Sequence, residues 1–220
     1  MNNQAILDAT VRYVQQTLAN AEGGHDWWHI YRVWRNAELI AKGEEGTDCL
    51  IVALGALLHD IADSKFHGGD EEVGPQTARA FLQAQEVDGS TIEHVENIIR
   101  HISFKGGAEE QAFTSLELSV VQDADRLDAM GAIGIARAFS YGGHTGKAIY
   151  DPGIPPNLQM TKEEYKNSTA PTINHFYEKL LRLKDKMNTE TGRRMAADRH
   201  KFMEQYLAQF FSECAPAIAL

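Results

Sequence analysis

An imidazole and a carboxylate stand side by side at the end of the most apolar stretch of the chain. The segment LIVALGALL, Leu50 to Leu58, is followed directly by His59 and Asp60. Burying these two polar groups without partners would be costly. A divalent cation removes that cost, because it binds neutral imidazole nitrogen and carboxylate oxygen together. The alternative is a pair that faces solvent at a helix end, where the helix dipole favours the imidazole.

Two other segments carry side chains that suit the same cation. His29 opens the segment HIYRV, and the segment QDADRLDAMG contains Asp123, Asp125 and Asp128. Successive residues of a helix are turned by about 100°, so the three carboxylates cannot all face one ion. Asp125 and Asp128 share a face, which suits a ligand with a neighbouring carboxylate that orients it.

This ordered set resembles the signature of the HD superfamily of metal-dependent phosphohydrolases: a helical His, a helical His-Asp pair and a later helical Asp. The resemblance covers about residues 25–140. It implies the metal ligands His29, His59, Asp60 and Asp125. Asp125 is preferred to Asp123 because the family places this ligand immediately before a basic residue, here Arg126. The segment after residue 160 resembles that of small stand-alone bacterial HD hydrolases, some of which act on nucleoside triphosphates.

Residues near the ligands are candidates for the remaining catalytic work. Asp63 lies one helical turn after His59, where its carboxylate could act as a general acid or base, a position at which several HD hydrolases carry a Glu. An anionic substrate must be held by positive groups in a protein that is acidic as a whole. We expect Lys65, Arg126 and His101 to bind phosphate and to neutralise charge during the reaction.

A second metal is an alternative that the sequence leaves open. His94 and His101 are seven residues apart, near the place where some HD families carry extra ligands. The mononuclear site is preferred, because no second acidic motif stands between His59 and His94. His67 and Lys105 are weaker candidates for phosphate contacts.

The segment around His29 also imitates a peptidase motif. His25 and His29 are four residues apart and enclose Asp26, as in the zinc-binding HExxH arrangement. Asp26 is shorter than the usual Glu, and two glycines before His25 place it at a helix start. The peptidase interpretation is therefore disfavoured.

Composition limits the classes of protein to consider. The chain has 220 residues, a net charge of −10 and 43% hydrophobic residues, as in an ordinary globular protein. The acidic residues are spread along the chain, which argues against a nucleic-acid surface. No apolar run approaches the roughly 20 residues of a membrane span, and no signal peptide is evident. The two cysteines form no zinc or disulfide pattern. We expect a cytoplasmic protein.

Periodicity predicts the elements that must position these residues. Helices are expected at about 3–19, 26–42, 48–62, 75–85, 90–102, 114–138, 168–186 and 190–214. Asp48 is the expected cap of the third helix, which should be the buried central one. The stretch 141–156 is rich in Gly and Pro and predicts a long loop.

Together these observations predict an all-α protein. We expect a single helical HD-type domain over residues 1–220, with a core at about 20–140, a loop over 141–167 and an appended C-terminal helical pair over 168–214. The substrate is expected to be a small phosphorylated molecule, first of all a (deoxy)nucleoside triphosphate that is cleaved with release of pyrophosphate. The alternatives are a nucleotide monophosphatase, a cyclic phosphodiesterase and a non-catalytic regulatory module that binds metal and nucleotide.

The expected cofactor is one divalent metal ion. Manganese is the first choice, with iron, nickel, magnesium, zinc and cobalt as alternatives; the imidazoles disfavour a pure magnesium site. We expect neither a nucleic-acid polymer nor a membrane as a partner. A homodimer is left open.

Overall fold

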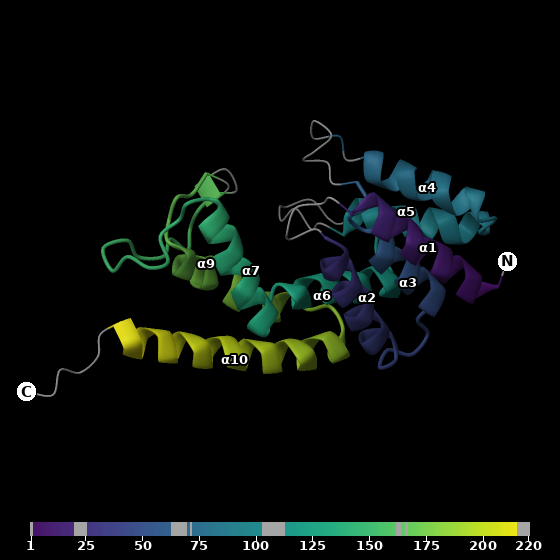
Figure 1. The fold of residues 1–220 in the computed structure, drawn as a ribbon. Coiled ribbons are helices and arrows are strands. Elements are labelled where there is room, and N and C mark those ends of the chain that lie inside the picture. Colours follow the sequence, from purple (N-terminus) through teal and green to yellow (C-terminus); the bar gives the residue numbers. More distant parts are fainter. Residues whose placement is uncertain are drawn as a thin grey trace, which may run out of the picture. The chain divides into compact units, whose positions relative to one another are not determined.

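A computed structural model describes residues 2–19, 26–62, 70, 72–102, 113–161, 164–165 and 167–214. Throughout these ranges the regular elements are helices, and no strand occurs (Figure 1). The all-α prediction is therefore confirmed. The elements are α1 (Asn3–Thr17), α2 (Trp27–Ala41), α3 (Cys49–Leu58), α4 (Val73–Ala84), α5 (Gly89–His101), α6 (Leu116–Asp128), α7 (Gly131–His144), α9 (Thr172–Glu178), the 3-10 helix η2 (Leu180–Lys186) and α10 (Glu190–Cys214).

The chain divides into two compact units. The first unit contains Met1–Asp125 and Asn188–Gly192, and the second contains Arg126–Met187 and Arg193–Leu220. The division falls inside α6, directly after Asp125, and inside α10. The expected domain boundaries at residues 20, 140 and 168 stay a prediction.

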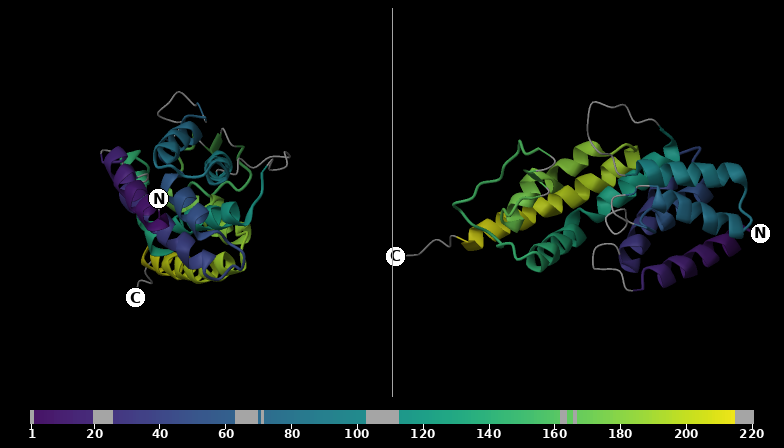
Figure 2. Two further views of the ribbon diagram at one scale, coloured as in Figure 1. Left: turned by 90° about the vertical axis from the view of Figure 1, so that its right-hand side faces the viewer. Right: turned by 90° about the horizontal axis from the view of Figure 1, so that it is seen from above.

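The core of the first unit forms around α3. The seven residues Val52 to Leu58 of this helix are all buried, as its continuous apolar sequence predicts. Helices α1, α2 and α5 contact α3, and α4 lies along α5 (Figure 2). Asp48 caps α3 as predicted, because its side chain accepts hydrogen bonds from the backbone N–H groups of Leu50 and Ile51. The cap fixes where α3 begins, and therefore which residues its last turn presents.

The single helix predicted over 114–138 is wrong: the chain breaks between α6 and α7. The amides of Ala129 and Met130 close a tight final turn on the carbonyls three residues earlier. Gly131 then adopts a φ of 67°, a left-handed conformation that glycine reaches without strain. The new helix α7 continues to His144, into the stretch predicted as loop.

The helix predicted over 168–186 also differs. It consists of α9 and the 3-10 helix η2, separated by Lys179 at φ −139° and ψ −57°. In the second unit, the ring of Phe176 on α9 stacks on the ring of Tyr206 on α10, with centroids 6.0 Å apart. None of the helices in the described ranges is long and apolar enough to cross a membrane.

Candidate metal centre

His29 lies in the first turn of α2 and is 1% exposed. Asp26 caps this helix, with its Oδ1 accepting a hydrogen bond of 2.9 Å from the backbone N–H of His29. The cap that begins α2 therefore also fixes the backbone of His29. Burial of this imidazole requires a polar partner for its ring nitrogens.

His59 is the residue that ends α3, and it is 7% exposed. Its Nδ1 lies 2.9 Å from the carbonyl oxygen of Ala56, so Nδ1 carries the proton and donates it. The opposite nitrogen, Nε2, is buried and has no hydrogen-bond partner in the part of the chain that the structure describes. This tautomer leaves a buried lone pair on Nε2, the state in which histidine binds a metal.

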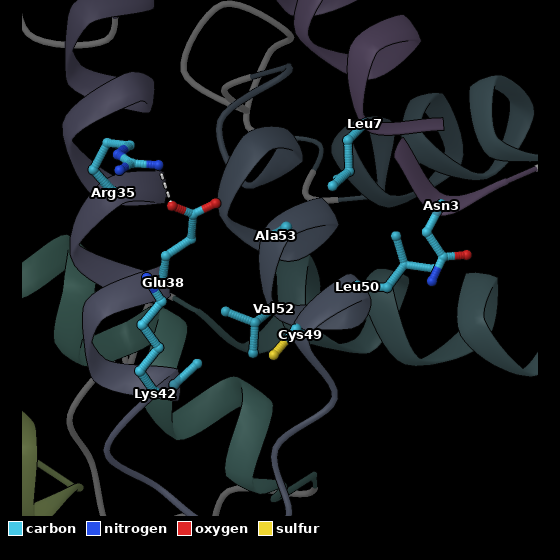
Figure 3. Close-up of a pocket in the computed structure, with 10 residues that line it drawn as sticks. Asn3, Leu7, Arg35, Glu38, Lys42, Cys49, Leu50, Val52 and Ala53 are labelled. Atoms are coloured by element: carbon cyan, nitrogen blue, oxygen red, sulfur yellow. Dashed lines mark hydrogen bonds and ion pairs between the residues drawn. The ribbon is translucent and has the colours of Figure 1, made fainter. Parts of the chain in front are cut away.

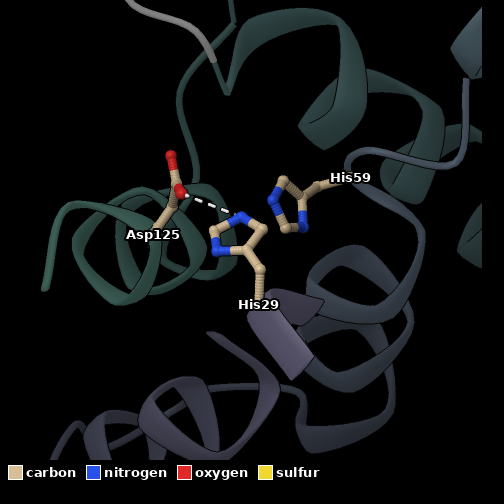
Figure 4. A group of neighbouring side chains, drawn as sticks. All are labelled: His29, His59 and Asp125. Atoms are coloured by element: carbon tan, nitrogen blue, oxygen red, sulfur yellow. Dashed lines mark ion pairs between the residues drawn. The ribbon is translucent and has the colours of Figure 1, made fainter. Parts of the chain in front are cut away.

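Two carboxylates stand beside the two imidazoles. An oxygen of Asp60 lies 3.4 Å from His59 Nε2 and 3.6 Å from His29 Nε2. An oxygen of Asp125, on α6, also lies 3.6 Å from His29 Nε2. Figure 4 shows this pair beside His59. One ligand atom each from His29, His59 and Asp125 lies within 4.8 Å of the others.

These separations fit a shared cation better than direct hydrogen bonds. A hydrogen bond between nitrogen and oxygen spans about 2.7–3.2 Å, which is shorter than the 3.4–3.6 Å observed. Two atoms that each lie about 2.1 Å from one ion are roughly 3.0–3.5 Å apart when they are neighbours in its coordination sphere. The buried, unpartnered Nε2 of His59 supplies the donor that such a site needs. The residues therefore fit a divalent metal ion.

The other two carboxylates of the DADRLD segment are engaged elsewhere. Asp123 is fully buried and accepts hydrogen bonds from the backbone N–H groups of Asn188 and Thr189. Asp128 is 1% exposed and forms an ion pair of 2.5 Å with Arg137. Of the three, Asp125 is the one grouped with the histidines.

Of the other residues that the sequence singles out, only some lie in the described ranges. Asp63 and Lys65 lie outside the described residues, as do His25, His67 and Lys105. Arg126 is the first residue of the second unit, where its Nη1 donates a 2.7 Å hydrogen bond to the carbonyl of Lys186. The Nδ1 of His101 lies 2.9 Å from the carbonyl of Asn97.

His94, the other candidate for a second metal, pairs within the first unit. Its Nε2 lies 2.9 Å from the hydroxyl of Ser115 and 3.4 Å from a carboxylate oxygen of Glu117. Within the described ranges, neither His94 nor His101 belongs to a group of three metal-binding side chains. The mononuclear site stays the preferred prediction.

Sequence reasoning missed the segment Asn188–Gly192, which packs against α6. The sequence predicts helices over 168–186 and 190–214 and assigns no role to the residues between them. Thr189 is a typical N-cap residue ahead of a helix, but nothing in the sequence pairs it with Asp123, 66 positions earlier.

A groove of about 450 Å³ lies elsewhere in the first unit. Figure 3 shows Arg35, Glu38 and Lys42 on one side, with Arg35 paired to Glu38, and Val52 among the apolar residues. Because Arg35 follows His29 by six residues, the groove is displaced by about 9 Å along α2 from the metal centre. It is therefore distinct from the site of the two histidines.

Comparison with known proteins shows which family and which solved structures this chain is similar to. The model of the HD domain family matches residues 27–130, a range that contains His29, His59, Asp60 and Asp125. The chain is similar to YpgQ of Bacillus subtilis, with 37% identity over 207 residues that cover 90% of this chain and 88% of YpgQ.

Solved structures agree over nearly the whole chain. An HD-superfamily hydrolase of Bacillus thuringiensis is 40% identical and superposes with a TM-score of 0.77, covering 96% of this chain and 98% of that one. The crystal structure of Bacillus subtilis YpgQ in complex with ADP superposes with a TM-score of 0.75 at 34% identity, over 100% of both chains.

Proposed function

This chain belongs to the HD domain family, and from that premise we propose that it is a divalent-metal-dependent phosphohydrolase that acts on a nucleotide. The observation that carries the proposal is the convergence of His29, His59 and Asp125 around the unpartnered Nε2 of His59. Membership of the HD superfamily, whose solved relatives include a named hydrolase, supports hydrolysis as the reaction class.

We assign the metal to His29, His59, Asp60 and Asp125. A divalent ion bound there supplies a nucleophilic water at neutral pH and polarises a phosphoryl oxygen. The protein's part is to hold neutral imidazoles and charged carboxylates in a fixed arrangement. The hydrogen bond from His59 Nδ1 to the carbonyl of Ala56 keeps the other nitrogen unprotonated, so that Nε2 would be available to bind a metal ion.

The remaining roles go to residues named from the sequence. Asp63 takes the proton of the attacking water, and Lys65, Arg126 and His101 bind the phosphate oxygens. In the proposed reaction the water oxygen attacks the α-phosphorus of a nucleoside triphosphate. The bond from that phosphorus to the α,β-bridging oxygen breaks, and pyrophosphate leaves from a nucleoside monophosphate.

The ADP bound to YpgQ supports a nucleotide as the substrate class. ADP has the base, sugar and α- and β-phosphates of a nucleoside triphosphate, so a site that accepts it has room for most of the proposed substrate. Manganese is our first choice of metal, since a mixed imidazole and carboxylate set suits it.

Product analysis tests this function. Purified protein with Mn²⁺ is incubated with a panel of ribo- and deoxyribonucleotides, and the phosphorus products are separated. We expect pyrophosphate and nucleoside monophosphate from triphosphates, with turnover lost in His59→Ala and kept in the control His94→Gln. Inorganic phosphate from monophosphates would identify a monophosphatase, and opening of cyclic nucleotides a phosphodiesterase. Metal and nucleotide binding without any product would identify a regulatory module.

A further inference from the structure

A fully buried carboxylate lies two residues from the proposed ligand Asp125. Asp123 accepts hydrogen bonds at its Oδ2 from the backbone N–H of Thr189 at 2.8 Å and from the Thr189 hydroxyl at 2.9 Å. The N–H of Asn188 lies within 3.0 Å of both carboxylate oxygens. Such a dense set of hydrogen bonds to a charged acceptor is strong and directional.

The segment that supplies these donors is held tightly to the first unit. The hydroxyl of Thr189 also accepts a hydrogen bond of 2.9 Å from the N–H of Gly192, which caps the first turn of α10. A Cβ on Gly192 would come within 2.4 Å of Asp123 Oδ2, so only glycine permits this approach. The N–H of Thr191 donates to Glu44 at 2.8 Å, which adds a second attachment.

Gln122 links the segment Asn188–Gly192 to α5. Its Oε1 accepts from the side-chain amide of Asn188 at 3.0 Å, and its Nε2 donates to the carbonyl of His101 at 2.9 Å. Two consecutive residues of α6 therefore bind segments far away in the sequence.

Helix geometry links this attachment to the metal centre. Residues two apart on a helix are turned by about 200°, so Asp123 and Asp125 occupy nearly opposite sides of α6. Asp125 lies 3.6 Å from His29 on one side, while Asp123 binds Asn188 and Thr189 on the other. Bonds on the rear side fix the rotation of α6 about its axis, and that rotation decides where the Asp125 carboxylate lies.

We propose that Asp123 is a positioning residue of the metal centre: its hydrogen bonds to Asn188 and Thr189 hold the rotation of α6 that directs Asp125 at His29. This inference rests on the proposed metal site. It also places Asn188–Gly192, which lies beyond the family match at 27–130, in the scaffold of that site. Groups that orient metal ligands typically change metal affinity by about 10- to 100-fold when they are replaced.

The test measures Mn²⁺ affinity by electron paramagnetic resonance, independently of turnover. Asp123→Asn keeps the shape of the side chain but loses one acceptor, and we expect the Mn²⁺ dissociation constant to rise about 10-fold or more. The matched control is Glu117→Gln, a buried carboxylate on the same helix that accepts the Asp48 N–H at 3.0 Å, two turns from Asp125. Glu117→Gln should lower the melting temperature without changing the dissociation constant.

A milder pair of variants covers the case in which Asp123→Asn fails to fold. Thr189→Val removes one donor to Asp123 and should weaken Mn²⁺ binding about threefold, whereas Thr189→Ser keeps the hydroxyl and should restore wild-type affinity. Wild-type Mn²⁺ affinity in both Asp123→Asn and Thr189→Val would overturn the inference and leave Asp123 with only the structural role of holding the segment Asn188–Gly192. Absence of Mn²⁺ binding in the unmodified protein would overturn the metal site and this inference together. Normal Mn²⁺ binding without nucleotide turnover would refute the proposed function alone.

Discussion

At the scale of single residues, the proposed metal site depends on which side-chain atoms bond to the protein itself and which remain available to an ion. His59 donates one nitrogen's hydrogen to the carbonyl of Ala56, and its other nitrogen is buried with no hydrogen-bond partner among the described residues. Asp128 is the opposite case, since its carboxylate is committed to Arg137. Asp125 of the same helix instead lies 3.6 Å from His29 Nε2, so two aspartates of α6 have different tasks, and substitutions should separate them.

Asp125→Asn should change Mn²⁺ affinity, whereas Asp128→Asn should change the free energy of unfolding. The Asp125 side chain is 42% exposed, so Asp125→Asn should change the stability of the metal-free protein little and weaken Mn²⁺ binding about 10- to 100-fold. Asp128→Asn breaks a pair in which Arg137 is 29% exposed, and should cost roughly 2–4 kcal/mol of unfolding free energy with Mn²⁺ affinity unchanged. Calorimetric binding and urea unfolding measure the two effects. The assignment of Asp125 fails if Asp128→Asn is the variant that loses the metal.

The sequence narrowed the last ligand to three residues but could not choose among them by itself. Spacing gives the angles between Asp123, Asp125 and Asp128 around the helix, yet it does not say which direction faces His29. The resemblance to the HD superfamily favoured Asp125, and the geometry groups that residue with the histidines. Asp63 and Lys65 lie outside the described residues, so their roles stay predictions.

A buried histidine in the second unit makes a prediction about acid stability. The ring of His175 accepts at Nδ1 from the hydroxyl of Tyr165 at 2.7 Å, and burial, with Lys179 and Lys147 nearby, lowers its pKa to about 4. The same kind of burial raises the pKa of Tyr165 to about 12. Both groups are therefore neutral at physiological pH.

The lowered pKa of His175 sets the direction of the pH effect. Below the ordinary value of 6.5 the unfolded chain binds a proton that the folded chain does not, so stability falls as the pH drops from about 6.5 to about 4. The difference in pKa corresponds to a loss of roughly 3 kcal/mol. Unfolding free energies measured across this range should fall less in His175→Gln than in the unmodified protein. Parallel profiles for the two proteins would contradict this account.

At the scale of elements, capping and glycine decide where the helices begin and end. Asp26 and Asp48 begin the helices that carry the two histidines, and both are ordinary N-cap residues that a sequence reveals. The break after α6 was missed because DADRLDAMGAIGIARAF keeps helical periodicity across Gly131. Periodicity records which residues face the core, and it does not record a change of backbone direction.

Gly131→Ala should therefore be destabilising. The left-handed φ of 67° strains any residue with a Cβ, and that Cβ would also meet the side chain of Arg199 at 3.2 Å. We expect a loss of about 1–2 kcal/mol in unfolding free energy. Gly143→Ala is the matched control, because its Cβ meets nothing within 4 Å and alanine favours the helical conformation of α7. Equal melting temperatures for the two variants would contradict the strain argument.

At the scale of the whole molecule, the order of the helices was largely predictable, while the long-range contacts were not. Amphipathic periodicity placed α1, α2, α4 and α5 to within a few residues, and a continuous apolar run placed α3. The approach of Asp125 to His29, 96 positions apart, was inferred from the family signature and not from the pattern of apolar residues. The contact of Asn188–Gly192 with α6 had no sequence signal, because hydrogen bonds between distant loops leave no periodicity.

A site that exists only in the folded chain must stabilise that chain when it binds its ligand. At a Mn²⁺ concentration of about 100 times its dissociation constant, the unfolding free energy should rise by about 2.7 kcal/mol. For a chain of this length the melting temperature should rise by roughly 5–10 °C. A chelator should reverse the change, and His59→Ala should show none of it. An equal rise in His59→Ala would place the stabilising metal elsewhere.

The most direct test of the metal centre is an anomalous difference map from crystals grown with Mn²⁺, recorded at the manganese absorption edge. The account predicts one strong peak within bonding distance of the Nε2 atoms of His29 and His59 and of the carboxylates of Asp60 and Asp125. A peak bound by other residues, or none at saturating Mn²⁺, would contradict it.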